Sequence, residues 1–206
     1  QSSGGSYVDF GNGAQQIGSS PRTYEMWGYT NAFNNGGLFQ GGITGSTSMD
    51  FSLRTLSTLD KWRVQTWGSG EFDITISGSS KSWHHYAMSY DGDTLKFFYD
   101  GELVGKEEAS INTDSHELWT GRWSSYYFNG KIDEFRVWNT ALPDSIIRSW
   151  RNKKIDNSHP NYNNLQALYN YNDGLVSTVA DESPINQVDG KLKGAAWRNI
   201  LRAENL

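Results

Sequence analysis

The chain has 206 residues, of which 36% are hydrophobic and 14% aromatic, and it contains no cysteine. This length suits one large domain or a domain with an appendage, and the lack of cysteine excludes disulfides and thiolate metal sites. A net charge of −5 argues against a nucleic-acid partner, and no apolar run is long enough to predict membrane insertion.

Short apolar runs, separated by Gly, Asn, Asp and Ser, fill the chain up to about Trp138 and predict strands. The runs are YVDF (7–10), TYEMWGY (23–29), LFQGG (38–42), DFSLRT (50–55), RVQTW (63–67), FDITIS (72–77), WHHYAMSY (83–90), LKFFYDG (95–101) and KIDEFRVW (131–138). Two Asp-Gly pairs flank the eighth run and predict a turn before it and a hairpin after it. So many strands without helices predict an all-β fold, a two-sheet antiparallel jelly-roll sandwich.

One short helix is expected near residues 143–153, where Pro143 and Asp144 suit a first turn and basic residues come last. The following stretch is polar and rich in turn residues, so we place a domain boundary there: a jelly roll over 1–152 and a C-terminal β extension over 153–206. The extension has strand-like runs at 165–171 and 190–197 but too few apolar residues for a core of its own. We therefore expect it to pack on the sandwich, with the first run extending a sheet edge.

Three motifs, RTYEMWGY, WHHYAMSYDGDTLKFFYDGELVG and GKIDEFRVWNTALPDSII, resemble the laminin-G-like, concanavalin-A-like jelly rolls of bacterial surface and secreted proteins. The resemblance covers roughly residues 5–150. The remaining tail resembles an extension of unknown function found in cell-surface proteins of polysaccharide-foraging Gram-negative bacteria. The resemblance implies two antiparallel sheets, one of them concave, an extracellular or outer-cell-surface location, and a glycan, protein or calcium as ligand. The chain begins with Gln1 and shows no apolar signal segment, which suggests a processed or excised piece.

Carboxylate spacing argues against a glycosidase. Neighbouring strand residues point to opposite faces, so Asp133 and Glu134 are not expected to act as a catalytic pair. Related laminarinase-type hydrolases carry acids in the pattern E-x-D-x-x-E; here Glu71 and Asp73 share a face, but the third position is Ile76. Adjacent His84 and His85 should likewise face apart and form no metal pair.

Because side chains alternate between the two faces of a strand, the apolar positions predict a core containing Tyr24, Met26, Phe72, Ile74, Ile76, Tyr86 and Met88. The opposite faces carry rings and arginines, as a carbohydrate surface requires, because rings stack on sugar C–H faces and charged groups bind hydroxyls. A ring at position 27 also has a packing interpretation in this fold. An aromatic loop at 119–127 adds further candidates, since loops on a rigid sandwich commonly bind ligands. The candidate glycan-binding residues are Trp27, Arg54, Arg63, Trp67, Trp123, Tyr126 and Tyr127, and the other rings at Trp62, Trp83, Trp138, Trp150 and Trp197 are assigned to packing.

Asp133 shares parity with Phe135 and Val137, so it either points inward or lies at a bulge beside the core. A buried carboxylate requires a partner. The resemblance implies a structural calcium ion there, completed by backbone carbonyls; hydrogen bonding to loop N–H groups is the alternative. Together these patterns predict a non-catalytic, lectin-like domain that binds a polysaccharide or oligosaccharide. A protein-interaction or adhesion module without a sugar site is the second hypothesis, and a polysaccharide-active enzyme the third.

Overall fold

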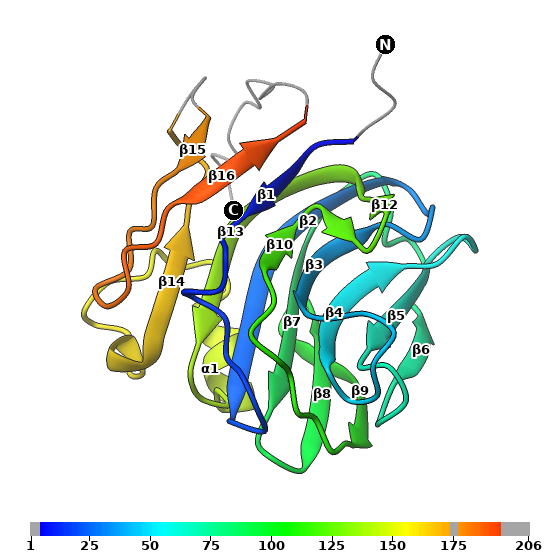
Figure 1. The fold of residues 1–206 in the computed structure, drawn as a ribbon, viewed down its shortest axis with the longest axis horizontal. Coiled ribbons are helices and arrows are strands. Elements are labelled where there is room, and N and C mark those ends of the chain that lie inside the picture. Colours follow the sequence, from blue (N-terminus) through cyan, green and yellow to red (C-terminus); the bar gives the residue numbers. More distant parts are fainter. Residues whose placement is uncertain (1–4, 174–176, 195–206) are drawn as a thin grey trace.

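The computed structural model describes residues 5–173 and 177–194 and consists of two antiparallel sheets packed face to face, with a single short α-helix among these residues (Figure 1). This confirms the predicted jelly-roll sandwich. No helix in the described ranges is long and apolar enough to cross a membrane.

The larger sheet contains ten strands of the described chain. Across the sheet they are β15 (Thr178–Val179), β16 (Gly190–Lys193), β1 (Tyr7–Asp9), β10 (Leu118–Thr120), β3 (Gly37–Gly42), β4 (Asp50–Thr55), β5 (Lys61–Gln65) and β6 (Phe72–Thr75). The hairpin of β11 (Arg122–Trp123) and β12 (Tyr126–Tyr127) is attached to β3 through a parallel pairing of Tyr127 with Gly37.

The smaller sheet has the order β14 (Leu165–Tyr169), β13 (Asn129–Trp138), β2 (Arg22–Ala32), β7 (Trp83–Tyr90), β8 (Thr94–Tyr99) and β9 (Glu102–Glu108). The nine apolar runs of the sequence therefore all contain strands. The short strands β10, β11 and β12 were not predicted, because dense rings and turn residues in that stretch obscure the alternation that marks a strand.

The main core lies between the sheets and is rich in aromatic rings. Tyr24 and Met26 of β2 and Tyr86 and Met88 of β7 are completely or almost completely buried, while Phe72, Ile74 and Ile76 pack against this cluster from β6 and the residue after it. All seven predicted core residues thus belong to one contiguous apolar cluster.

A second apolar cluster covers the outer face of the smaller sheet. The helix α1 (Asp144–Trp150) and the chain on either side of it bring Leu142, Ile147 and Ile155 onto Phe98 and Trp138. Strand β2 is consequently buried on both faces over most of its length. Trp62 and Trp138 are fully buried and Trp150 packs on the second cluster, as assigned from the sequence; Trp197 lies outside the described residues.

The described part of the tail is connected to both sheets. A 3₁₀ turn (η1, Tyr162–Asn164) leads into β14, which pairs with β13 from Phe135–Tyr169 to Trp138–Leu165. Further on, β16 pairs with β1 in the larger sheet, and β15 pairs with β16 (Figure 1). Leu165, Ala167 and Tyr169 are fully buried. The division of the chain at residue 152 itself stays a prediction.

Candidate functional site

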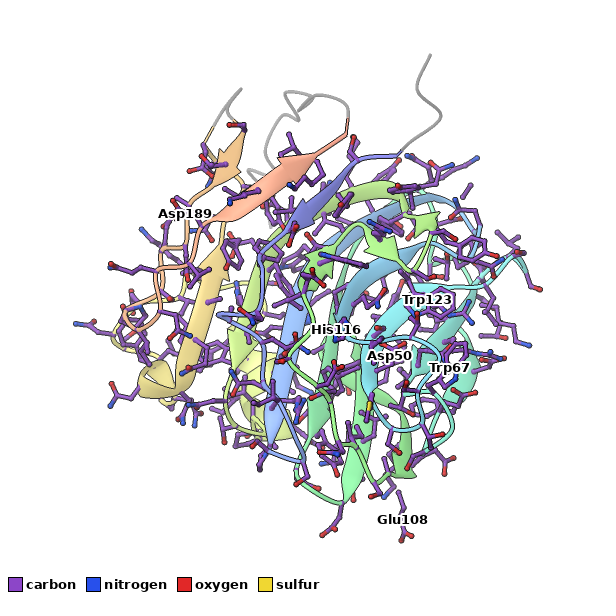
Figure 2. All side chains as sticks on the ribbon, viewed as in Figure 1. Asp50, Trp67, Glu108, His116, Trp123 and Asp189 are labelled. Atoms are coloured by element: carbon purple, nitrogen blue, oxygen red, sulfur yellow. The ribbon has the colours of Figure 1, made fainter. Side chains whose placement is uncertain are left out.

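Three rings gather on the outer face of the larger sheet: Trp67, Trp123 and Tyr126 (the Trp67 cluster). Trp123 lies between the other two, with ring centroids 6.2 Å from Trp67 and 5.9 Å from Tyr126, the latter pair stacked. Trp67 is 37% exposed and Tyr126 is 46% exposed, whereas Trp123 is only 7% exposed. Figure 2 shows Trp67 and Trp123 close together over β4 and β5. The outer two rings are therefore available to a ligand, and the middle ring supports them.

The guanidinium of Arg54 lies 4.1 Å from the ring centroid of Trp123 and is covered by it. Its Nε donates to Gln65 Oε1 at 3.1 Å, and Gln65 in turn donates to Glu71 Oε2 at 2.5 Å. Arg54 is 7% exposed. Arg54 holds Trp123 by a cation–π contact and, being buried, supports the cluster, whereas the sequence predicted it as a glycan-binding residue.

A buried carboxylate lies beneath the cluster. Asp50 accepts a hydrogen bond from Trp123 Nε1 at 3.0 Å and another from the hydroxyl of Ser52. Because burial penalises the charged form and these two donors compensate it only in part, the pKa of Asp50 is raised to about 7. Asp50 therefore fixes the rotation of the Trp123 ring, and its charge changes near neutral pH.

The acids of β6 and the turn before it are engaged by neighbouring side chains. Asp73 pairs with Arg63 through two hydrogen bonds, Nε–Oδ1 at 2.5 Å and Nη2–Oδ2 at 3.0 Å, and this pairing lowers the pKa of Asp73. Glu71 accepts hydrogen bonds from Gln65 and from the backbone of Gly68. Ile76 packs against the core. Arg63 and its partner form a polar edge beside the aromatic cluster.

Glycine positions the hairpin that carries Trp123. A Cβ atom on Gly37 of β3 would lie 2.5 Å from Trp123 Cβ and 2.6 Å from the carbonyl oxygen of Arg122. The hairpin backbone therefore approaches β3 more closely than any side chain would permit. The amide of Ser124 at the hairpin turn donates to Gln40 Oε1 at 2.6 Å, which fixes the tip as well.

Tyr127 belongs to a different cluster on the same sheet. The guanidinium of Arg122 lies between the rings of Tyr7, Trp119 and Tyr127, at 4.8, 4.4 and 5.7 Å from their centroids. A shallow depression of about 240 Å³ lies beside it, lined in part by Gln40, Trp119 and Arg122. The predicted aromatic loop thus divides, with Tyr126 on one side and Tyr127 on the other.

Trp27 lies on the smaller sheet, so it does not share a surface with Arg54, Arg63 or Trp67. It pairs in register with His85 and Asp133, is 9% exposed, and donates from Nε1 to the carbonyl oxygen of Arg151 at 3.1 Å. Trp27 is therefore separated from the other candidate glycan-binding residues, which lie on or beside the larger sheet. Strand parity distinguishes inner from outer faces but does not identify the sheet.

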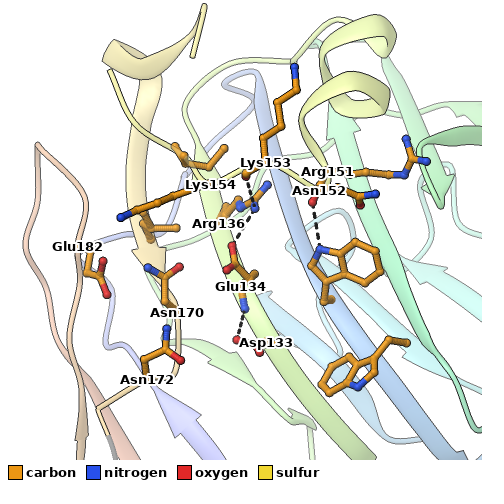
Figure 3. A pocket seen from close by; sticks show the side chains of 14 residues that line it. Asp133, Glu134, Arg136, Arg151, Asn152, Lys153, Lys154, Asn170, Asn172 and Glu182 are labelled. Atoms are coloured by element: carbon orange, nitrogen blue, oxygen red, sulfur yellow. Dashed lines mark hydrogen bonds and ion pairs between the residues drawn. The ribbon is translucent and has the colours of Figure 1, made fainter. Parts of the chain in front are cut away.

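Asp133 and Glu134 lie in one cleft, which corrects the expectation that they face apart (Figure 3). The pairing of β13 with β2 is irregular between Asp133 and Arg136, and Glu134 has φ 54°. This bulge inserts one residue, so Asp133 shares the outer face with Trp27 while Phe135 still points into the core. Glu134 also lines the cleft and pairs with Arg136 at 2.8 Å. His84 and His85, in contrast, pair with Gly28 and Trp27 and face apart as expected.

Several functional candidates were missed by sequence reasoning. Asp50 and Gln40 position Trp123 and its hairpin, Arg122 organises the second ring cluster, and Trp83 was assigned only to packing although it lines the cleft. Asp50 is the first residue of a strand in which Asp50, Ser52 and Arg54 alternate with apolar residues. This alternation is the one sequence signal that places Asp50 on the same outward face as Arg54.

Comparison with known proteins gives a family but no curated relative. Residues 2–148 match the model of the concanavalin A-like lectin/glucanases superfamily. No curated protein matches the chain.

Among solved structures, the chain is similar to a candidate carbohydrate-binding protein of Bacteroides ovatus (19% identity, TM-score 0.70). The similarity covers 92% of this chain and 56% of that one, so this chain spans little more than half of that protein. It is also similar to a heptameric SAP-like pentraxin of Limulus polyphemus (15%, TM-score 0.55, 72% and 76% covered). A third similar structure is the CBM40 of the Ruminococcus gnavus IT-sialidase (16%, TM-score 0.50, 64% and 83% covered). At these identities the structures share the fold. Because the family model matches residues 2–148, most of this chain, the chain belongs to the concanavalin A-like lectin/glucanase superfamily.

Proposed function

We propose that this chain is a non-catalytic carbohydrate-binding domain of an extracellular or cell-surface protein, and that it binds polysaccharide through the Trp67 cluster. The observation that carries the proposal is the pair of exposed rings, Trp67 and Tyr126, held on either side of a buried Trp123. A flat aromatic platform with a polar edge matches the alternation of C–H faces and hydroxyls on a sugar chain. The carbohydrate-binding proteins among the structural neighbours support the same class of ligand.

We propose different roles for the residues of this surface, and the contacts around them support these roles. Trp67 and Tyr126 stack on sugar rings, Arg63 with Asp73 binds hydroxyls at the edge, and Trp123, Arg54 and Asp50 hold the platform in place. A stacked ring contributes roughly 1–3 kcal/mol in nucleic-acid complexes, so each sugar contact should be weak. Useful retention then depends on repeated glycan sites or several modules.

Affinity electrophoresis tests the proposal. Trp67→Ala and Tyr126→Ala should each reduce retention of the domain on a binding polysaccharide, because each removes an exposed stacking surface. Leu103→Ala is the matched control: Leu103 is 40% exposed but lies on β9 in the other sheet, so its loss should leave retention unchanged. A parent domain that no polysaccharide retains, or two ring variants that migrate like the parent, would overturn the proposal.

The cleft holding Asp133 and Glu134 supports a second candidate function, hydrolysis of a glycan, since a glycosidase needs two carboxyls on one surface. Glu134 is already paired with Arg136, and this favours the non-catalytic proposal. Release of reducing ends from any polysaccharide, abolished by Glu134→Gln or by Glu71→Gln, would establish the enzyme. We expect no release.

Calcium at Asp133 remains a separate proposal. The cleft offers hard oxygen donors, since the Asp133 carboxylate and the amides of Asn170 and Asn172 all line it (Figure 3), and calcium accepts such mixed oxygen sets. Within the described ranges no group of three or more His, Cys, Asp or Glu side chains is arranged to hold a metal ion, so an ion at Asp133 would rely on amide and backbone oxygens. Calcium should raise the melting temperature of the parent, because a ligand bound only to the folded state stabilises it. Asp133→Ala should abolish that rise; a parent indifferent to both calcium and chelator would refute the site.

A further inference from the structure

A cleft lies on the outer face of the smaller sheet, on the other side of the sandwich from the Trp67 cluster. It has a volume of about 590 Å³, which is within the usual range for small-molecule sites, about 300–1,000 Å³. Its lining includes Trp27 and Trp83 from β2 and β7, Asp133 and Glu134 from β13, and Asn170 and Asn172 after β14 (Figure 3). The cleft thus combines two indole rings with carboxylates and amides.

The walls of the cleft are fixed by a buried arginine. Arg136 is 2% exposed and holds Glu134 from one wall, while it also donates to the carbonyl oxygens of Trp150 at 3.5 Å and Lys153 at 3.3 Å on the opposite wall. Trp27 Nε1 binds the carbonyl oxygen of Arg151. Both sides of the opening are therefore tied to the sheet, so the cleft is formed before a ligand arrives and binding requires little ordering.

A buried carboxylate, Glu25, lies behind the lining residue Arg136 and stays ionised. Glu25 is paired with Arg136 at 3.3 Å and with His85 at 3.2 Å, and it accepts a hydrogen bond from Trp138 Nε1. Burial alone would raise its pKa, but these partners together hold the pKa of Glu25 at about 2. The ion pair of Glu25 and Arg136 helps to keep the cleft open. Separating the two side chains would leave a buried charge without a partner, which is costly.

The lining chemistry favours a neutral saccharide. Two of the basic residues at the opening are directed elsewhere: Arg151 donates to the carbonyl oxygen of Arg148 at 2.5 Å, and the ammonium of Lys153 lies 4.6 Å from the ring centroid of Trp150. Arg136 is also paired, and the fourth basic lining residue, Lys154, shares the cleft with three carboxylates, Asp133, Glu134 and Glu182, so an anion would meet negative as well as positive charge. Carboxylate acceptors, amide groups that both donate and accept, and an indole face are the groups that recognise hydroxyls and sugar C–H faces.

We propose that this cleft is a second saccharide-binding site, which takes the end of a short neutral oligosaccharide with Trp83 as its stacking residue and Asp133 as a hydroxyl acceptor. The domain is then bivalent, with one site on each outer face of the sandwich. Because the two sites face in opposite directions, the domain can bridge separate glycan chains. Retention increases because binding at one site raises the effective concentration of glycan at the other.

Isothermal titration calorimetry of a Trp67→Ala background isolates the second site. The probes are cellotriose, laminaritriose, maltotriose and mannotriose, each titrated with calcium and again with chelator so that a metal contribution is seen separately. The background should still bind at least one probe saturably. Adding Trp83→Ala should weaken that binding about tenfold or more, the scale of one lost stacking contact, and Asp133→Asn should weaken it as well. Adding Trp83→Phe should preserve most of the binding.

Leu103→Ala in the same background is the matched control and should change nothing. Melting curves of every variant separate a lost site from a lost fold. The inference is overturned if the Trp67→Ala background binds none of the four trisaccharides, or if its binding is unaffected by Trp83→Ala. Neither result affects the proposed function, which depends on retention of the parent by polysaccharide and on weaker retention of Trp67→Ala.

Discussion

Asp50 illustrates how a single residue links the fold to the site. Asp50 is fully buried and is the first residue of β4, where its side chain belongs to the outer face of the sheet. It accepts hydrogen bonds from Ser52 and Trp123. Its pKa of about 7 lies above the ordinary aspartate value of 3.8. Between these two values the folded protein binds a proton that the unfolded chain has released, so the contribution of Asp50 to stability falls as pH rises towards 7.

Asp50→Asn should remove this penalty. The variant should gain stability relative to the parent as pH rises from about 4 to about 7, by up to roughly 1.4 kcal/mol per pH unit, and gain nothing further above that. Urea unfolding at a series of pH values measures the difference. Asp73→Asn is the control: Arg63 lowers the pKa of Asp73, so any pH-dependent difference for that variant falls below about pH 4. A constant difference between Asp50→Asn and the parent from acid to neutral pH would contradict the raised pKa.

Trp123 and Trp67 make a matched pair because they are neighbours with different exposure. Trp123→Ala removes a ring that is 7% exposed and covers Asp50 and Arg54, so it should cost about 3–5 kcal/mol of unfolding free energy. Trp67→Ala removes a ring that is 37% exposed and should cost about 1 kcal/mol or less. Chemical denaturation checks both values. Similar costs for the two variants would show that Trp123 does not support the platform.

At the scale of elements, the bulge in β13 changes the function assigned to two acids. A regular strand would place Asp133 and Glu134 on opposite faces, but φ 54° at Glu134 brings both to the cleft. The sequence carries no glycine at this point, and the local sign of a bulge is Asp133 itself, a carboxylate in the same alternation as the core residues Phe135 and Val137. The bulge exists because β13 pairs with β2 on both sides of an extra residue, from Asp133–Trp27 to Arg136–Glu25.

Substitutions at Glu134 test the bulge. Glu134→Gly and Glu134→Val both remove the ion pair with Arg136, so the difference between them reports the backbone alone. Because a β-branched side chain is strained at positive φ, Glu134→Val should be less stable than Glu134→Gly by about 1–2 kcal/mol. Thermal and urea unfolding provide the measurement. Equal stability, or a more stable valine variant, would mean that the strand is regular here.

At the scale of the whole molecule, the tail connects the two sheets. Its first strand, β14, extends the smaller sheet, and β16 joins β1 in the larger one. The same tail supplies Asn170 and Asn172 to the cleft. We therefore propose that the sandwich and the described tail fold as one unit, even though the family model ends at residue 148.

Truncation after Asn152 tests this unity. The shortened chain loses the buried side chains of Leu165, Ala167 and Tyr169 from the edge of the core, so it should be less soluble and melt at a lower temperature. Limited proteolysis provides an independent measurement. Clean removal of the tail by a protease, with an unchanged melting temperature of the remainder, would instead identify the tail as a separate appendage.

The sequence by itself determined most of the strands, the short helix, the core and the superfamily. These follow from local patterns: alternation of apolar residues sets which side chains face inward, and Asp-Gly pairs set the hairpin. Only the tertiary structure decided which outward residues share a surface. The alternation of side chains assigns both Trp27 and Trp67 to an outward face. They lie on different sheets, because β2 pairs with β7 and β13, whereas β5, the strand before Trp67, pairs with β4 and β6. Strand pairing depends on contacts far apart in the chain, so the two proposed sites lie on opposite faces of the sandwich for a reason that no local pattern records.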